Sequence, residues 1–371
     1  MKPISKVLSP FWWCLLGLCL PGSPARAQDY AENFSIERFP THRLITVRNV
    51  HRDSTARHRY ALVPKGDPAP KLPEDVRLIR TPVERLVAME TVYIGHLEAL
   101  DLLDRLAGAA TAEYISNPEV RARVESGEIR RVQIGQNLDI ERMLTLRPDL
   151  ILTSISGDPS FDVPPQLTRS GLPVVLSAGY MERHPLARAE WIKFTAAFFE
   201  ADDEARRIFD GIADRYEALG ARTAGLEERP SVFCAAPYSG AWHMPGGLSY
   251  TAQTIRDAGG RYLWADTETR GSMPLDTERV FLKAAEADFW INPSHHRTLD
   301  ELLAADPRFA KFEAVKQGRV YNNTRQVTPN GGNPIWEAGI VRPDLVLADL
   351  IHIFHPEILP EHELVFYEPV D

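Results

Sequence analysis

The residues of this chain best suited to chemistry are aromatic and polar side chains in predicted loops, many of them just after predicted buried strands. The aromatic members are Tyr93, Tyr114, Tyr180, Tyr238, Trp242 and Trp336. The polar members are Thr91, Ser154, Arg270 and Asn330. Flat aromatic faces suit a macrocycle or a catecholate, and a guanidinium pairs with a carboxylate or another anion. Local packing explains each aromatic residue about as well when it is taken singly, but the group favours binding of a small molecule.

Motifs of catalysis and of metal binding are missing from the sequence. It contains no G-x-S-x-G turn, no H-E-x-x-H and no glycine-rich phosphate loop. His295 and His296 are adjacent, but neighbouring residues rarely chelate one ion without further partners. His184 and His243 could each reach a haem iron, although a surface position suits both better. We therefore expect a protein that is not an enzyme, with no catalytic residue, no metal ligand and no resident cofactor.

The N-terminus has the pattern of a secretory signal peptide. Lys2 and Lys6 precede an apolar stretch over 11–20, and Ala25-Arg26-Ala27 matches an A-x-A cleavage site. Cys14 and Cys19 follow large residues, whereas a lipoprotein signal requires a small one before its cysteine. We expect residues 1–27 to be removed and the product to be soluble, so that a lipoprotein is the less favoured alternative.

Length, charge and cysteine content narrow the class of protein. A chain of 371 residues is too long for one ordinary core and suits two lobes. The net charge of −9 and the absence of a basic run argue against nucleic-acid binding. Once residues 1–27 are removed, Cys234 is the remaining cysteine, and its apolar surroundings predict a buried strand thiol rather than a nucleophile.

Short apolar strands alternate with helices from residue 84 onward, which predicts parallel α/β sheets. About forty residues from Pro185 interrupt the alternation with helical periodicity and one break, and the α/β pattern resumes after Pro230. We therefore expect two Rossmann-like lobes joined by one long helix. The predicted units are a signal peptide (1–27), an extension and linker (28–83), a first lobe (84–184), a connecting helix (185–228) and a second lobe (229–371).

An internal repeat supports two equivalent lobes. The sequence L-D-x-E-R occurs at Leu138–Arg142 and again at Leu275–Arg279, and each copy precedes a helix and then an apolar strand. Such an echo indicates pseudo-symmetry and says nothing of function by itself.

These segments resemble the periplasmic substrate-binding proteins of ABC importers for iron siderophores and vitamin B12. The similarity rests on Asn137-Leu138, Glu141 and Leu146–Ile151, on their counterpart from Leu275 to Ile291, and on Phe312–Val320. It covers roughly residues 84–358. The resemblance implies two α/β lobes joined by a rigid helix, with ligand held in the cleft between them.

The resemblance also implies partners and a location. Glu141 and Glu278 match the glutamates that dock each lobe onto a permease dimer, which works with an ATPase in the inner membrane. A helix-start acid favoured by the helix dipole is the alternative reading of both. The protein would be a periplasmic monomer that carries a metal chelate: a ferric siderophore first, then a cobalamin, then haem. A secreted hydrolase and a ligand sensor are the alternatives from other classes.

Overall fold

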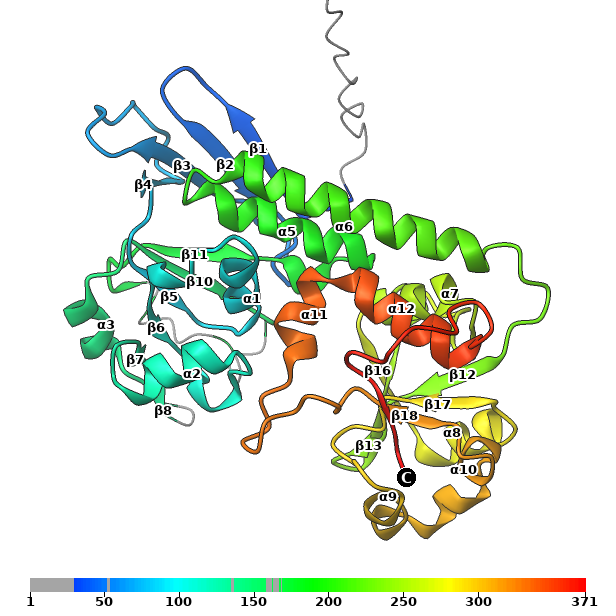
Figure 1. Cartoon of the computed structure of the whole chain (residues 1–371). Coiled ribbons are helices and arrows are strands. Elements are labelled where there is room, and N and C mark those ends of the chain that lie inside the picture. The colour runs from blue at the N-terminus through cyan, green and yellow to red at the C-terminus, as the bar shows by residue number, and fades with distance from the viewer. Residues whose placement is uncertain (1–29, 52–53, 135–136, 158–161, 163–166, 168) are drawn as a thin grey trace, which may run out of the picture.

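The computed structural model describes residues 30–371 except 52–53, 135–136, 158–161, 163–166 and 168. The predicted signal peptide lies outside these residues. The chain forms two α/β lobes with a long helix running across both, as the sequence predicted (Figure 1). The predicted extension builds a third sheet beside the first lobe.

The third sheet has four strands in sequential order. They are β1 (Phe34–Arg38), β2 (Arg43–Val47), β3 (His58–Pro64) and β4 (Val76–Thr81). The inward side chains of β2 and β3, among them Ile45 and Leu62, belong to the same buried core as the first lobe. The extension is therefore an integral layer of that lobe, because its apolar face packs on the lobe instead of facing water.

The first lobe contains a five-stranded parallel sheet in the order β11-β10-β5-β6-β7. Its strands are β5 (Leu86–Ala88), β6 (Leu106–Ala109), β7 (Arg130–Arg131), β10 (Leu150–Ser154) and β11 (Val174–Ser177). Its helices are α1 (Val92–Ala99), α2 (Pro118–Glu125) and α3 (Ile140–Leu146), and β8 (Gln133–Ile134) pairs with β9 (Asn137–Leu138).

The second lobe repeats this plan with the order β15-β12-β17-β18-β19, in which the last strand is antiparallel. Its strands are β12 (Ser231–Cys234), β15 (Arg261–Tyr262), β17 (Phe289–Ile291), β18 (Val320–Asn322) and β19 (Glu368–Pro369). A smaller sheet joins β13 (Pro237–Tyr238), β14 (Ala241–Pro245) and β16 (Ser272–Leu275). The helices are α7 (Tyr250–Asp257), α8 (Thr277–Ala284), α9 (Leu299–Ala305), α10 (Glu313–Lys316), α11 (Ala338–Val341) and α12 (Pro343–Phe354).

The connecting segment holds the long helix, α6 (Asp202–Thr223), and a shorter one before it, α5 (Pro185–Ala197). The predicted interruption falls at 198–201, where Glu200 adopts φ 61°. The chain turns there, so that α5 packs along α6 and the Lys193 ammonium lies 4.2 Å from the Phe209 ring centroid.

Helix α5 contributes to the cores of both lobes. Leu186 and Ile192 belong to the core of the second lobe, whereas Trp191 and Phe194 belong to the core of the first. A helix that is apolar on two sides is buried between two parts of the protein, here the two lobes. The lobes are therefore joined by shared packing as well as by covalent continuity.

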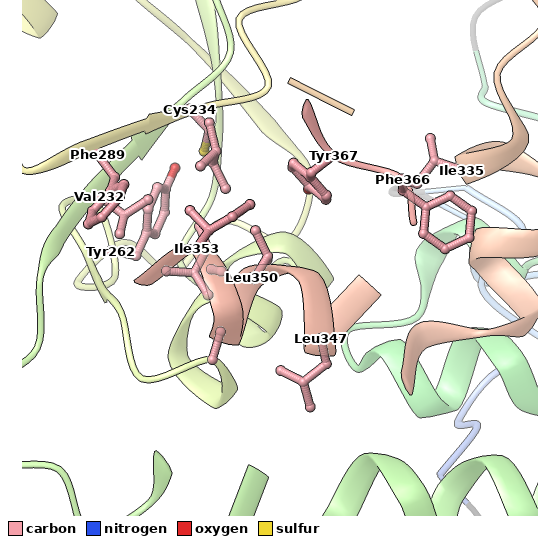
Figure 2. Close-up of a cluster of buried hydrophobic side chains, with 14 of the residues drawn as sticks. Val232, Cys234, Tyr262, Phe289, Ile335, Leu347, Leu350, Ile353, Phe366 and Tyr367 are labelled. Carbon is pink, nitrogen blue, oxygen red and sulfur yellow. The ribbon is translucent and has the colours of Figure 1, made fainter. Parts of the chain in front are cut away.

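Helix α12 closes the second lobe. Figure 2 shows Leu350 and Ile353 of this helix facing Val232, Cys234 and Phe289 of the sheet. Cys234 is buried and unpaired, as the sequence predicted. Burial raises the pKa of its thiol to about 12, so the sulfur is neutral at physiological pH.

Candidate functional site

A cleft of about 920 Å³ lies between the two lobes. The first lobe contributes Ser156, Gly157, Tyr180 and Met181, which follow strands β10 and β11, and the third sheet adds Asn49, Ser54 and Thr55. The second lobe contributes Glu268, Thr269, Arg270 and Gly271. Loops after the carboxyl ends of parallel strands are the usual ligand-binding elements of α/β sheets. The cleft is the candidate ligand site.

Tyr180 belongs to a short 3-10 helix over Gly179–Met181, just beyond β11. Its single O–H lies within hydrogen-bond distance of two carbonyl oxygens, that of Ile155 at 2.8 Å and that of Val50 at 3.1 Å. These bonds hold the phenol ring across the strand ends, while 39% of the residue stays exposed. Tyr180 therefore lines the cleft as a half-exposed aromatic side chain whose hydroxyl is held by the backbone.

Arg270 lies opposite on a loop that two glycines support. Gly246 N donates to Gly271 O at 2.7 Å, and a Cβ at Gly246 would lie 2.1 Å from Thr269 O. A Cβ at Gly247 would lie 2.5 Å from Ala265 O. No side chain other than hydrogen fits there, which allows the loop to pack down. Arg270 is exposed and has no ion-pair partner among the described residues, so its charge is available to an anion.

Of the other residues expected to bind ligand, two lie at the edge of the first lobe. Ser154 ends β10, and its backbone N–H donates to the Glu90 carboxyl. Burial raises the pKa of Glu90. Thr91 precedes α1 and is half-buried. Neither Ser154 nor Thr91 lines the 920 Å³ cleft.

Two expected binding residues lie in the core instead. Tyr93 is 2% exposed and its hydroxyl shares a 2.8 Å hydrogen bond with Ser177. Trp242 is fully buried, and its indole N–H donates to Cys234 O at 2.9 Å. Core packing occupies both rings, so we leave them out of the candidate site. The sequence also favoured core positions for Trp191 and Trp264, and both are buried.

Four further residues expected at the site lie elsewhere on the molecule. Tyr238 is exposed on β13. Tyr114, of the first lobe, faces the turn that carries Asn330, since a Cβ at Gly331 would lie 3.8 Å from its ring. Trp336 is half-exposed and lines a separate cavity. Their roles in ligand binding stay predictions.

The sequence missed the contribution of the third sheet. Asn49, Ser54 and Thr55 line the cleft, yet they lie in the segment that the sequence predicts to be an extension and linker. Their polar side chains between two predicted strands fit an ordinary surface loop equally well. Only the packing of this sheet on the first lobe brings them to the cleft.

The repeated L-D-x-E-R segments build two equivalent helix starts. Asp139 accepts a hydrogen bond from Arg142 N at 2.8 Å and caps α3. Asp276 accepts one from Glu278 N at 2.8 Å and caps α8. Each aspartate therefore caps the helix that follows it, which gives the two copies similar helix starts. The glutamates of both copies are exposed in the first turn.

An exposed leucine lies one helical turn beyond each glutamate. Leu144 follows Glu141 on α3 and is 47% exposed. Leu282 follows Glu278 on α8 and is 85% exposed. Residues three or four apart share one helix face. Each lobe thus presents an acid and an apolar side chain together, although Glu278 also pairs with Arg308.

Two negative findings concern the described residues. Within them, no three His, Cys, Asp or Glu side chains come together to hold a metal ion. None of the helices in the same part of the chain combines the length and apolar character needed to cross a bilayer. His243 is exposed, and His184 accepts from Leu186 N at the start of α5.

Comparison with known proteins identifies the family. Residues 86–326 match the model for periplasmic binding proteins, and the chain belongs to this family. This agrees with the resemblance in the sequence to the helix-linked substrate-binding proteins of ABC transporters. Membership indicates a transport protein that binds a small molecule outside the cytoplasm.

Relatives and solved structures are consistent with this family. An uncharacterized lipoprotein of Methanocaldococcus jannaschii is 26% identical over 83% of this chain and 75% of its own length. A periplasmic heme-binding protein from Pseudomonas aeruginosa has 18% identity and a TM-score of 0.57, covering 78% of this chain and 98% of that one. An Fe3+-hydroxamate transport protein from Saccharomonospora viridis has 17% identity and a TM-score of 0.53, covering 75% and 93%. At these identities the structures establish the fold alone.

Proposed function

We propose that this protein is the exported solute-binding component of an ABC importer and captures an anionic iron complex, with a ferric siderophore as the first candidate. The observation that carries the proposal is the cleft with Tyr180 on one lobe and Arg270 on the other. A ligand that contacts both would bridge the lobes.

The chemistry of the cleft favours an anionic chelate over haem. Its walls are mostly hydroxyl, amide and charged side chains. Glu268 and Arg270 are the charged ones, and Arg270 has no ion-pair partner among the described residues. Haem presents a large apolar face, which polar side chains match less well. The cleft volume of about 920 Å³ lies within the usual range for small-molecule sites.

The known structures of similar fold support a metal-containing cargo in general terms. The Pseudomonas protein is described as binding heme, and the Saccharomonospora protein as part of a transport system for Fe3+-hydroxamate. A Helicobacter pylori protein with a TM-score of 0.58 is described as a complex with nickel and histidine. Cargo varies within the fold, so the side chains of this cleft must decide it.

Delivery would use Glu141 and Glu278 as docking residues on a permease dimer that works with an ATPase. Two carboxylates, one on each lobe, can fix the orientation of the protein on a two-fold partner. The exposed Leu144 and Leu282 would add apolar contact beside each charge. The lipoprotein name of the Methanocaldococcus relative keeps open a lipid-anchored form, but our proposal is a soluble periplasmic monomer after cleavage at residue 27.

Isothermal titration calorimetry of the purified protein tests the cargo. The titrants are a ferric trihydroxamate, a ferric triscatecholate, haemin and cyanocobalamin. We expect saturable binding of one ferric siderophore, weakened about tenfold in Arg270→Gln because a charge-assisted contact is lost. Arg279→Gln, an exposed arginine on α8, is the matched control and should bind as the wild type does.

Each other outcome assigns the protein differently. Tight binding of haemin or cyanocobalamin alone would replace the siderophore with that cargo. Equal affinities in wild type and Arg270→Gln would remove the cleft from the proposal. Hydrolysis of an added ester or glycoside would favour the enzyme alternative.

A further inference from the structure

A second cavity, of about 240 Å³, lies at the carboxyl ends of β12 and β17 in the second lobe. It shares no lining residue with the interlobe cleft. Its walls come from the sheet and from α5, α7, α11 and α12. Figure 2 shows four of the lining residues, Cys234, Ile335, Leu350 and Tyr367. The cavity is smaller than the usual site for a drug-sized ligand, so it suits a small molecule.

Arg188 of α5 brings a cation to this apolar cavity. Its guanidinium carbon lies 4.1 Å from the centroid of the Tyr250 ring, which holds the group in place by a cation–π contact. Its Nε and Nη1 atoms are buried and have no hydrogen-bond partner in the described structure. Unsatisfied donors on a half-buried guanidinium are costly, so an anion bound beside this group would be favoured.

The rest of the lining adds no negative charge. Among the described residues around the cavity, Arg188 is the one with an ionised side chain, since the Cys234 thiol is neutral. Asn292, at the end of β17, has a side-chain hydrogen bond with Tyr367, and its buried Oδ1 has no partner among the described residues. An unpaired acceptor suits a hydroxyl or amino group of a ligand.

We propose that this cavity binds a small monocarboxylate with an apolar body, its carboxylate on Arg188 and its aromatic or short aliphatic part against Ile335, Val346 and Leu350. A hydroxyl on the ligand would donate to Asn292. This site goes beyond the proposed capture of an iron complex, because it uses a different cavity and a different class of ligand.

The test uses the full protein and a panel of benzoate, 4-hydroxybenzoate, phenylacetate and hexanoate, with benzamide as the neutral analogue. Calorimetry reports binding, and so does intrinsic tryptophan fluorescence, to which the half-exposed Trp336 at the cavity contributes. We expect saturable binding of at least one carboxylate, no measurable binding of benzamide, and a loss of about 10- to 100-fold in Arg188→Met.

Two further variants keep the proposal falsifiable if Arg188→Met does not fold. Val346→Phe fills the cavity but keeps the cation, and it should abolish binding. Arg207→Met, which alters an exposed arginine on α6, should leave binding unchanged. The proposal is overturned if no carboxylate saturates the folded wild type, if benzamide binds equally well, if Val346→Phe binds normally, or if the carboxylate competes with a ferric chelate for the interlobe cleft.

Discussion

Glu337, from the carboxyl-terminal half of the chain, accepts a 2.6 Å hydrogen bond from the backbone N–H of Ser116 in the first lobe. Its second carboxylate oxygen accepts from Asn117 N at 3.1 Å. The backbone of Glu337 also lies against α1, since a Cβ at Gly95 would come within 2.6 Å of its carbonyl oxygen. This contact therefore joins the carboxyl-terminal half of the chain to the first lobe, in addition to the packing that both lobes share with α5.

The contribution of Glu337 to stability should fall as pH rises. Burial is the main cause that raises the pKa of this carboxyl above its ordinary value. The folded state then binds more protons than the unfolded state between the ordinary and the raised pKa, so the free energy of unfolding decreases with pH across that window. Glu337→Gln has no carboxyl to titrate at this position. The unfolding free energy of the wild type minus that of the variant should be highest below about pH 4.5, the ordinary pKa of the carboxyl, and should fall at higher pH. Urea unfolding of both proteins from pH 4 to 8 measures this quantity. A value of wild type minus variant that rises with pH contradicts the expectation.

Ligand binding should move the lobes little. The shared helix α5 and the Glu337 contact both resist opening, because each would have to break buried packing or hydrogen bonds. Small-angle scattering with and without a saturating ferric chelate should give the same radius of gyration within error. A large compaction would mean that these contacts open in the unliganded protein.

Trp191→Ala should destabilise both lobes together. The indole packs 4.8 Å from the Phe34 ring centroid and 4.7 Å from that of Phe194, and its N–H donates to Glu182. Replacing a buried tryptophan by alanine lowers the free energy of unfolding by about 3–5 kcal/mol. Chemical denaturation should show one shifted transition. The half-exposed Trp336 provides the control, since Trp336→Ala should cost about 1 kcal/mol or less. Two separate transitions would contradict the coupling through α5.

The docking surfaces can be tested through the exposed leucines. Leu144→Ser with Leu282→Ser should reduce stimulation of the cognate permease–ATPase complex in proteoliposomes, as should Glu141→Ala with Glu278→Ala. Ligand affinity should be unchanged in both, because these residues lie outside the cleft. The matched control is Glu125→Ala with Glu286→Ala, exposed acids on the same two lobes. Normal stimulation by both test variants would remove these surfaces from docking.

The Cys234 thiol should be inert in the native protein. With a pKa raised to about 12 by burial, it carries almost no thiolate at pH 8. In protein without residues 1–27, reaction with a disulfide reagent should follow the rate of unfolding and become immediate in denaturant. Fast labelling of the folded protein would instead point to a reactive cysteine.

The sequence alone determined the features that depend on local pattern. Apolar strands alternating with helices define the two α/β lobes, and Pro185 marks the start of α5 as predicted. The L-D-x-E-R repeat marks two capped helices because the cap and the first turn are encoded within a few residues. The burial of Cys234 followed in the same way from its apolar neighbours.

The tertiary structure decided what depends on contacts between distant segments. Tyr93 and Tyr180 both follow apolar strands, yet one ring packs in the core and the other faces the cleft, because the turn after each strand sets its direction. Asn49 reaches the cleft only because the third sheet packs on the first lobe. In the sequence, Arg188 has the pattern of an ordinary surface charge on a helix. It becomes a candidate anion-binding residue only because α5 packs against the second lobe. Such placements arise from packing across hundreds of residues, which periodicity along the chain does not encode.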